Sequence, residues 1–454
     1  MADLFLTHGY FLDEDPKEQK IMRPYPPLGL LYVSAHLKQN GQNVHLFDST
    51  FSSFNELKKA LLEQNPKVLA LYTNLMTKLN VLKIMAWVSE HLPNCKRVVG
   101  GPDVSYNIEN YLKHGAQFVV VGEGESTMLE LAEHLISGKG ALTDIDGIAY
   151  LENNKTISNK PRTKLKDLAE LPLPDRASID FERYLDVWKT HHGKRTANIS
   201  TQRGCPYTCK WCSTAVYGQS YRRRPATQVA DEVEMLQQEF GVEALWFVDD
   251  VFTVSHKWLA ELHSEFKNRN LRIDFECITR AERMNETVLQ QLKEMGCFRI
   301  WIGAESGSQR IINKMDRRVD INLVAEMMQK TQEFGIEAGT FIMVGYPSEE
   351  LSDIKQTAAY LRKAKPNLLT ITKTYPIKGT SLYHEIEDHI TVQPPWESST
   401  DRDIKFKLPQ KDGFYQLAIR YIMNEYHAAK STSPLKKIKH QLKAKVAFLG
   451  MRSQ

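Results

Sequence analysis

The stretch Arg203-Gly204-Cys205-Pro206-Tyr207-Thr208-Cys209-Lys210-Trp211-Cys212 decides most of what this chain can be. Its three thiols lie within eight positions, on a loop that Gly204 and Pro206 open, so they can converge on one inorganic centre. A 4Fe–4S cluster takes thiolate ligands, usually four. Three cysteines would leave one iron free to bind another molecule.

Zinc is the competing centre, but structural zinc takes four closed ligands, usually as two separated pairs. No second Cys-x-x-Cys or Cys/His pair occurs, and Cys95, Cys277 and Cys297 are scattered beside apolar or strand-like sequence. A chance grouping of three cysteines in a loop is the remaining alternative. The spacing favours the iron–sulfur interpretation.

Length and composition indicate a multidomain enzyme. A chain of 454 residues with 42% hydrophobic content can bury two or three cores. The net charge of +4 is too balanced to indicate nucleic acid. No basic, apolar leader and no apolar run of membrane-spanning length is found. Six cysteines, three of them clustered, suit a reducing compartment, so we expect a cytoplasmic protein.

Residues 1–138 alternate short apolar runs with helical periods, which predicts βαβ units around a parallel sheet. The expected strands are Asp3–His8, Asn43–Asp48, Val68–Thr73, Arg97–Gly100 and Phe118–Val121. The expected helices are Leu28–Asn40, Ala60–Gln64, Val81–His91 and Thr127–Ile136. We therefore expect a Rossmann-like, flavodoxin-like α/β domain.

Ligands of such sheets bind in the loops after the strands. The candidates here are Thr73, Asn74 and Leu75 after the third strand, Gly100 and Gly101 after the fourth, and Gly122 and Glu123 after the fifth. Glycine would permit a ligand to approach the backbone closely. Ordinary turn glycines are the alternative.

Residues 139–190 are expected to form a connector with a β-hairpin around Asn153-Asn154. Residues 191–392 repeat a strand followed by a helix about six times, which predicts a partial (β/α)6 barrel of the TIM type. The expected strands are Ala197–Ser200, Leu245–Val248, Asp274–Ile278, Phe298–Ile302, Gly339–Val344 and Leu368–Thr372. Arg222, Arg223 and Arg224 are expected to form a solvated basic turn, although one could screen the metal centre or dock an electron donor.

Residues 393–454 are expected to form a small helical region with helices over Gly413–Lys430 and Pro434–Leu449. No Asp or Glu follows Glu425, and apolar residues recur at helical spacing among lysines. The last helix could pack on the barrel as a cap, contact an anionic membrane surface or bind an acidic partner.

The pattern Cys-x-x-x-Cys-x-aromatic-Cys, with Trp211 as the aromatic residue, resembles the radical S-adenosylmethionine (SAM) superfamily. The resemblance implies that Cys205, Cys209 and Cys212 hold a 4Fe–4S cluster whose open iron binds SAM. The reduced cluster of that family cleaves SAM to methionine and a 5′-deoxyadenosyl radical. The protein then supplies binding and orientation.

The strand ends of the barrel also match the family, and this implies roles for further residues. Trp211 would lie near the adenine, and Arg280 would pair with the SAM carboxylate. Asp249 or Asp250 would accept from the SAM ammonium or face the substrate. Glu305 would accept from the ribose or the amino group, and Gly345 would let a strand pass beneath the adenine. For each polar residue an internal ion pair is the alternative.

The segments Pro26–Leu31, Val98–Pro102 and Val120–Glu125 resemble the cobalamin-binding domain that precedes the barrel in one radical SAM subclass. This resemblance adds Leu28 and Gly29 to the candidate cobalamin contacts. The cobalt-ligating signature Asp-x-His-x-x-Gly is absent, and Asp48–Ser53 stands in its place. We therefore expect cobalt to have no histidine ligand. His8, at the end of the first strand, is the one histidine placed to reach a corrin.

The resemblance implies a cobalamin-dependent radical SAM enzyme that functionalises an unactivated carbon, with C-methylation as the leading reaction. Cyclisation, rearrangement or oxygenation of the anaerobic cyclase type is the alternative, as is a radical SAM enzyme with a degenerate first domain. A cofactor carrier or sensor without turnover is the non-enzymatic alternative. The expected partners are a small-molecule or natural-product substrate and a flavodoxin- or ferredoxin-type electron donor.

Overall fold

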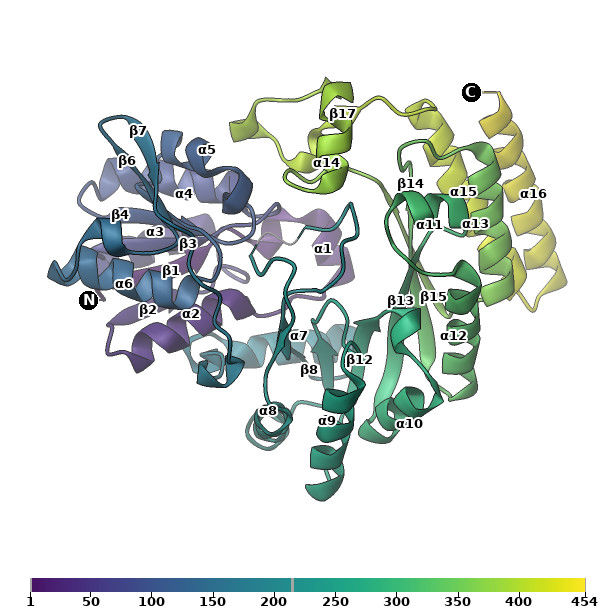
Figure 1. Ribbon diagram of the computed structural model, residues 1–454, viewed down its shortest axis with the longest axis horizontal. Helices are drawn as coiled ribbons and strands as arrows, with labels where there is room; N and C mark the ends of the chain where they lie inside the picture. The colour runs from purple at the N-terminus through teal and green to yellow at the C-terminus, as the bar shows by residue number, and fades with distance from the viewer. Residues whose placement is uncertain (1, 214–215, 454) are drawn as a thin grey trace. The chain divides into compact units, whose positions relative to one another are not determined.

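The computed structural model describes residues 2–213 and 216–453, and Figure 1 traces the chain through them. The chain folds into two compact units. The first consists of Met1–Pro206, Ser213–Ala244 and Gln393–Asp403, and the second of Tyr207–Cys212, Leu245–Val392 and Ile404–Gln454. Residues 139–206, expected as a connector and the first barrel strand, thus pack within the first unit.

The first unit is built on a seven-stranded sheet with the order β2-β1-β3-β4-β5-β6-β7. The strands β1 to β5 are parallel, as the alternating pattern predicts, and β6 and β7 extend the sheet as an antiparallel hairpin. Their bounds are β1 Leu4–His8, β2 Val44–Phe47, β3 Val68–Tyr72, β4 Lys96–Gly100, β5 Phe118–Val120, β6 Ile148–Glu152 and β7 Lys155–Ser158. The predicted hairpin therefore exists, but it belongs to the sheet.

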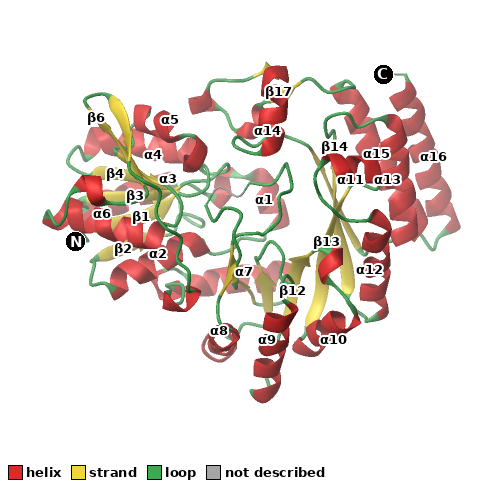
Figure 2. Cartoon of the chain, in the orientation of Figure 1, coloured by secondary structure: helices red, strands yellow, loops and turns green. Residues whose placement is uncertain are grey.

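Helices cover both faces of this sheet because each strand buries side chains on both sides. One core joins Leu57 of α3 and Val81 of α4 to the strands, and the other joins Leu31 of α2 and Leu131 of α6. Figure 2 shows helices alternating with these strands. The helix bounds are α1 Pro16–Ile21, α2 Leu28–Gln39, α3 Phe54–Gln64, α4 Lys78–His91, α5 Ile108–Lys113 and α6 Gly124–Ser137.

The remaining elements of the first unit include one helix that lies in the predicted connector and was not predicted, α7 Phe181–His192. Asp180 begins α7 by accepting from the Arg183 N–H, and Gly193 ends it in the left-handed region. Trp188 of this helix is buried and donates to the Pro24 carbonyl at 2.7 Å. The other elements are β8 Thr196–Ile199, β9 Gln202–Arg203, β10 Arg222–Arg223 and α8 Ala226–Phe240.

The second large sheet has the order β15-β14-β13-β12-β11-β8, so its strands follow one another as in a partial (β/α)6 barrel. The strands β12 to β15 are parallel. The strand bounds are β11 Ala244–Phe247, β12 Asp274–Thr279, β13 Cys297–Glu305, β14 Glu337–Val344 and β15 Leu368–Lys373. The helices of the second unit are α9 His256–Asn268, α10 Glu286–Met295, α11 Gln309–Lys314, α12 Ile321–Glu333, α13 Leu351–Ala364 and α14 Ser381–Ile386.

The chain ends in a short hairpin and two long helices. The hairpin consists of β16 Ile390–Val392 and β17 Lys405–Phe406, and the helices are α15 Asp412–Lys430 and α16 Pro434–Arg452. The two predicted C-terminal helices are therefore confirmed. Within the described residues, no helix has the length and apolar character needed to cross a bilayer.

Candidate functional site

The cysteine loop leaves β9 at Arg203 and returns at β10. The two short strands pair antiparallel, with Arg203 opposite Arg222 and Gln202 opposite Arg223. Gly204 has φ +82°, and a Cβ there would lie 2.3 Å from the Ser220 Oγ, so only glycine fits where the hairpin closes. The hairpin thus fixes both ends of the loop.

The three candidate cluster ligands are all cysteines outside any disulfide. Cys205 is buried, Cys209 is half-buried and Cys212 is exposed. No set of three His, Cys, Asp or Glu side chains within residues 2–213 and 216–453 is gathered as a metal site. The donor set nevertheless fits a cluster, because three reduced thiols on one loop are the ligands that iron–sulfur centres require.

Arg280 lies against this loop. It is buried directly after β12, and its Nη1 donates to the Cys209 Sγ at 3.4 Å. Its guanidinium stacks on the Tyr207 ring, 3.9 Å from the ring centroid, and it also contacts Glu282 and the Arg317 carbonyl. A cation at this point would stabilise negative charge on a ligated thiolate.

The other predicted SAM contacts stand where their strands end. Asp249 is buried and Asp250 is exposed, both just after β11. Trp211 is half-buried within the cysteine loop.

Glu305 ends β13 with φ +63°, an uncommon conformation for a side-chain-bearing residue. It folds back over Gly303, where a Cβ would lie 2.5 Å from the Glu305 Oε1. Desolvation raises the pKa of the Glu305 carboxyl, and the charges of Arg317 and Arg280 oppose this shift. The residue is therefore a half-buried acid beside two cations, which suits a hydrogen-bond acceptor for a polar ligand.

Gly345 follows β14 with φ +80° and donates its N–H to the Glu349 Oε2 at 2.6 Å. Glu349 is buried, and its Oε1 has no hydrogen-bond partner in the described residues. Desolvation raises the pKa of Glu349 to about 8. Gly345 thus lies at a turn that its hydrogen bond to Glu349 stabilises, on the same edge of the sheet as Glu305 and Arg280.

The candidate cobalamin loops gather at one edge of the first sheet, because β3, β4 and β5 are adjacent and parallel. Gly101 has φ +116°, and a Cβ there would lie 2.3 Å from the Thr73 carbonyl oxygen. The Thr73 N–H donates to the Gly100 carbonyl at 2.8 Å, and the Thr73 Oγ1 lies 2.9 Å from the Tyr111 hydroxyl. The two loops are therefore locked together through their backbones.

The remaining candidate cobalamin contacts lie at the same edge. Asn74 orders the start of α4 by accepting from the N–H groups of Met76 and Thr77, which leaves Leu75 half-buried at the tip. Leu28 and Gly29 open α2, and a Cβ on Gly29 would lie 3.7 Å from the Tyr72 ring. A cavity of about 300 Å³ is lined in part by Gly122 and Glu123. The glycines and small polar residues of this edge are the kind that would let a corrin approach the backbone closely.

His8 is not free to reach such a ligand. Its ring is buried, its Nε2 lies 2.8 Å from the Asp48 Oδ1, and its Nδ1 accepts from the Tyr10 N–H at 3.1 Å. Asp48 also accepts from the Tyr184 hydroxyl at 2.6 Å. Burial raises the pKa of Asp48, but the hydrogen bonds from His8 and Tyr184 lower it further than burial raises it. Both ring nitrogens of His8 are therefore engaged, one by Asp48, which follows β2, and the other by the Tyr10 N–H.

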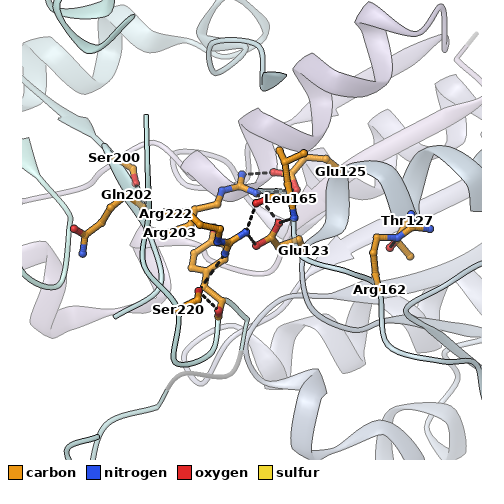
Figure 3. A network of polar contacts seen from close by, with 11 residues as sticks. Glu123, Glu125, Thr127, Arg162, Leu165, Ser200, Gln202, Arg203, Ser220 and Arg222 are labelled. Atoms are coloured by element: carbon orange, nitrogen blue, oxygen red, sulfur yellow. Dashed lines mark hydrogen bonds and ion pairs between the residues drawn. The ribbon is translucent and has the colours of Figure 1, made fainter. Parts of the chain in front are cut away.

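A buried ionic network ties the loop after β5 to both ends of the cysteine loop (Figure 3). Arg203 pairs with Glu125 through both terminal nitrogens, one of them at 3.2 Å, and lies 3.7 Å from Glu123. Arg222 pairs with Glu123 at 2.5 Å. Tyr32 and Tyr217 stack on the Arg203 guanidinium. We call Glu123, Glu125, Arg203 and Arg222 the loop clamp.

Both members of the central pair of the loop clamp are ionised. Burial lowers the pKa of Arg203, but the Glu125 carboxylate raises it further. Burial raises the pKa of Glu125, and the same pair overcomes this effect and lowers it. Glu123, predicted as a cobalamin contact, thus also holds the cysteine loop.

The arginine run is not the solvated basic turn that was expected, because Arg222 and Arg223 are half-buried and Arg224 is buried. Arg224 is buried and pairs with Glu232 of α8, which also lies 3.1 Å from Arg176. Arg223 donates to the Gln202 side chain at 2.8 Å. The only sequence signal for these contacts was a high local density of Arg and Glu, which does not identify partners.

Family models match two parts of the chain. The Radical SAM superfamily model matches residues 199–361, and the B12 binding domain model matches residues 20–132. The chain is 26% identical over 390 residues to an uncharacterized methyltransferase of Pyrococcus horikoshii, which is 84% of this chain and 83% of that protein. It is 24% identical over 387 residues to an anaerobic magnesium-protoporphyrin IX monomethyl ester cyclase of Cereibacter sphaeroides, 82% of this chain and 62% of that protein.

A solved structure extends the likeness to the fold. The cobalamin-dependent S-adenosylmethionine radical enzyme OxsB with aqua-cobalamin bound superposes with a TM-score of 0.78 and 16% identity, over 99% of this chain and 72% of that chain. The two matched domains imply a 4Fe–4S cluster, SAM and cobalamin as cofactors. The chain is therefore a radical SAM enzyme with an N-terminal B12-binding domain.

Proposed function

We propose that this enzyme methylates an unactivated carbon of a small-molecule substrate. The observation that carries the proposal is the pairing, on one chain, of a three-cysteine loop with a B12-binding domain. SAM alone supplies an electrophilic methyl group, which an unactivated carbon does not attack. A cobalamin carrier and a radical source together remove that obstacle.

The residues that would hold the cofactors are those already located. Cys205, Cys209 and Cys212 would ligate the iron–sulfur cluster, and Arg280 would balance its negative charge or hold the SAM carboxylate. When bound, the cluster and cobalamin would supply radical generation and methyl transfer respectively. Trp211, Asp249, Asp250, Glu305 and Gly345 would hold the rest of SAM.

The corrin would lie on the loops after β3, β4 and β5. Thr73, Asn74, Gly100, Gly101 and Gly122 offer backbone and small polar groups there, and Leu75, Leu28 and Gly29 offer apolar contact. With both nitrogens of His8 engaged, no histidine from β1 reaches the lower face of the corrin. Cobalt without a nitrogen ligand is reduced more easily to a nucleophilic state, which suits methyl transfer.

Radical-mediated cyclisation is the second candidate function, and the likeness to the anaerobic cyclase favours it. Either reaction needs electrons one at a time, which we assign to a flavodoxin- or ferredoxin-type donor. The substrate is a small molecule or natural product in both cases.

Product analysis separates the two reactions. Anaerobic, reconstituted enzyme with cobalamin, dithionite and SAM should be incubated with cell extract as the substrate source, and nucleosides separated by HPLC. Methylation predicts S-adenosylhomocysteine together with 5′-deoxyadenosine. Formation of 5′-deoxyadenosine without S-adenosylhomocysteine would contradict methylation and support the cyclase alternative.

A further inference from the structure

The last helix, α16, packs on α15 of its own unit through one face, where Phe448 also contacts the Tyr421 ring. Its buried side chains are Ala444, Ala447 and Met451, and they face α15. Figure 1 shows α16 beyond α15, on the side away from the strands of the second unit. The contact therefore uses one narrow face of α16 and leaves the opposite face uncovered by that unit.

The uncovered face carries the large apolar residues of the helix. Leu435 is 80% exposed, Ile438 52%, Leu442 60%, Val446 70% and Leu449 54%. Their spacing of three, four, four and three residues places all five on one stripe of an α-helix. We call these five residues the outer stripe. Exposed apolar side chains are ordinary when scattered, but a continuous stripe indicates a binding surface.

The charges around the outer stripe have a single sign. The helix α16 contains no Asp or Glu, so its Lys and Arg side chains have no acidic neighbour within the helix. They are Lys436, Lys437, Lys439, Lys443, Lys445 and Arg452. The last acidic residue before the helix, Glu425, is engaged by Arg362 at 2.6 Å. A partner for this face must therefore be apolar at its centre and negatively charged at its rim.

We propose that α16 lies in the surface of an anionic lipid bilayer, with the outer stripe in the acyl region and the lysines at the headgroups. A second copy of this helix would bring two clusters of cations together, which disfavours self-association. A bilayer meets both requirements at once, because lysine stems extend along apolar surface while their ammonium groups reach phosphate. The 19-residue helix is too rich in lysine to span a bilayer, which fits a helix lying in the interface.

Flotation with defined vesicles tests this proposal. Full-length protein should float with vesicles of phosphatidylglycerol and phosphatidylcholine in 0.1 M salt, and at least about tenfold less with phosphatidylcholine alone or in 0.5 M salt. The double variant Leu442→Ser/Val446→Ser should lose at least about tenfold of the bound fraction. Leu62→Ser, at a comparably exposed leucine of α3, is the matched control and should float like the wild type.

Three outcomes would overturn the proposal. The first is an absence of flotation with anionic vesicles, and the second is equal flotation of the double variant and the wild type. The third is a dimer by light scattering that the double variant abolishes, which would make a second copy the occupant. The exposed positions of the outer stripe permit serine without a cavity, and circular dichroism checks that the variants are folded.

Discussion

The three cysteines of the loop differ in their surroundings, and this matters for how a cluster would assemble. Cys205 is buried at the closed end of the β9–β10 hairpin, whereas Cys212 is exposed. Between them, Cys209 is contacted by Arg280, whose guanidinium is held by the Tyr207 ring and Glu282. A buried cation next to the middle ligand prepares the loop for the negative charge of thiolates and of a bound carboxylate.

We predict that Cys209→Ala removes the cluster while Cys95→Ala leaves it. Cys209 belongs to the cysteine loop, and Cys95 is buried in the core of the first unit. After anaerobic reconstitution, the iron content and the visible absorbance at about 400 nm should both fall at least about tenfold in Cys209→Ala and in no measure in Cys95→Ala. Unchanged iron in that variant would remove Cys209 from the ligand set.

We predict a pH-dependent stability from Glu349. Because the pKa of its carboxyl rises to about 8 in the folded chain, the folded state holds this proton more tightly than the unfolded state does. The contribution of this carboxyl to the free energy of unfolding is therefore complete below its unfolded-state pKa of about 4.5, and it is lost as the pH rises through about 8. The free energy of unfolding of Glu349→Gln should match that of the wild type at about pH 5 and exceed it by about 2 kcal/mol at about pH 9.

Urea unfolding of both proteins at the two pH values measures this difference. Asp412→Asn is the matched control, because Asp412 is an exposed acid paired with Lys373 on the same unit. The control should not become more stable than the wild type at the higher pH. A constant offset between Glu349→Gln and wild type at both pH values would contradict the assignment.

At the scale of elements, the loop clamp connects α6, β9 and β10 through buried charges. Glu125 is at the start of α6, Arg203 ends β9, and Arg222 begins β10. A movement of the loop after β5 would therefore be passed to both ends of the cysteine loop. Within the first unit, this connects the loop after β5 to the residues beside Cys205, the first of the proposed cluster ligands.

We predict that Glu125→Gln destabilises the first unit by about 3 kcal/mol, because it leaves Arg203 buried with a weaker partner. Glu130→Gln is the matched control on the same helix, since Glu130 is partly exposed and pairs with Arg162. The control should change stability by less than about 1 kcal/mol. Chemical unfolding measures both, and equal effects would show that the loop clamp is no stronger than a surface pair.

Gly101 provides a second prediction at this scale. A methyl group there would clash with the Thr73 carbonyl, and the residue also has a positive φ. Gly101→Ala should therefore weaken hydroxocobalamin binding at least about tenfold by separating the two loops. Gly140 also has a positive φ, but a Cβ there would have no atom within 4 Å. Gly140→Ala is therefore the matched control and should bind hydroxocobalamin like the wild type. Equal binding by both variants, measured by spectral titration, would contradict the role of this edge.

Local patterns were sufficient for most elements and insufficient for the contacts between them. The strands β1 to β5 and β12, with α15 and α16, follow the predicted ranges closely, because alternation and helical spacing are properties of adjacent residues. The loop clamp joins residues 78 positions apart, and the partners of His8 lie 40 positions away. Hydrophobic periodicity contains no information about such pairs. The same limit explains why the arginine run was expected in solvent. It does not apply to α7, whose buried residues Phe181, Tyr184, Leu185 and Trp188 recur at helical spacing in the sequence.

At the scale of the whole molecule, the candidate cofactor residues are divided between the two units, and α16 carries the proposed membrane-binding surface. The first unit contains the B12-binding domain and the β9–β10 hairpin, and the second contains Arg280, Glu305 and Gly345. The outer stripe of α16 is far from these residues in sequence and shares none of them. Loss of membrane binding should therefore leave the cofactors in place.

The cofactor content of a single preparation tests the central claim, that one chain holds both a cluster and a corrinoid. Wild-type protein should be purified anaerobically from cells supplied with iron and cobalamin, and its iron, sulfide and corrinoid measured per chain. We predict about four irons, about four sulfides and about one corrinoid, with no nitrogen splitting in the electron paramagnetic resonance spectrum of the cob(II) form. A preparation that contains the cluster but no corrinoid, before or after reconstitution with hydroxocobalamin, would contradict the account.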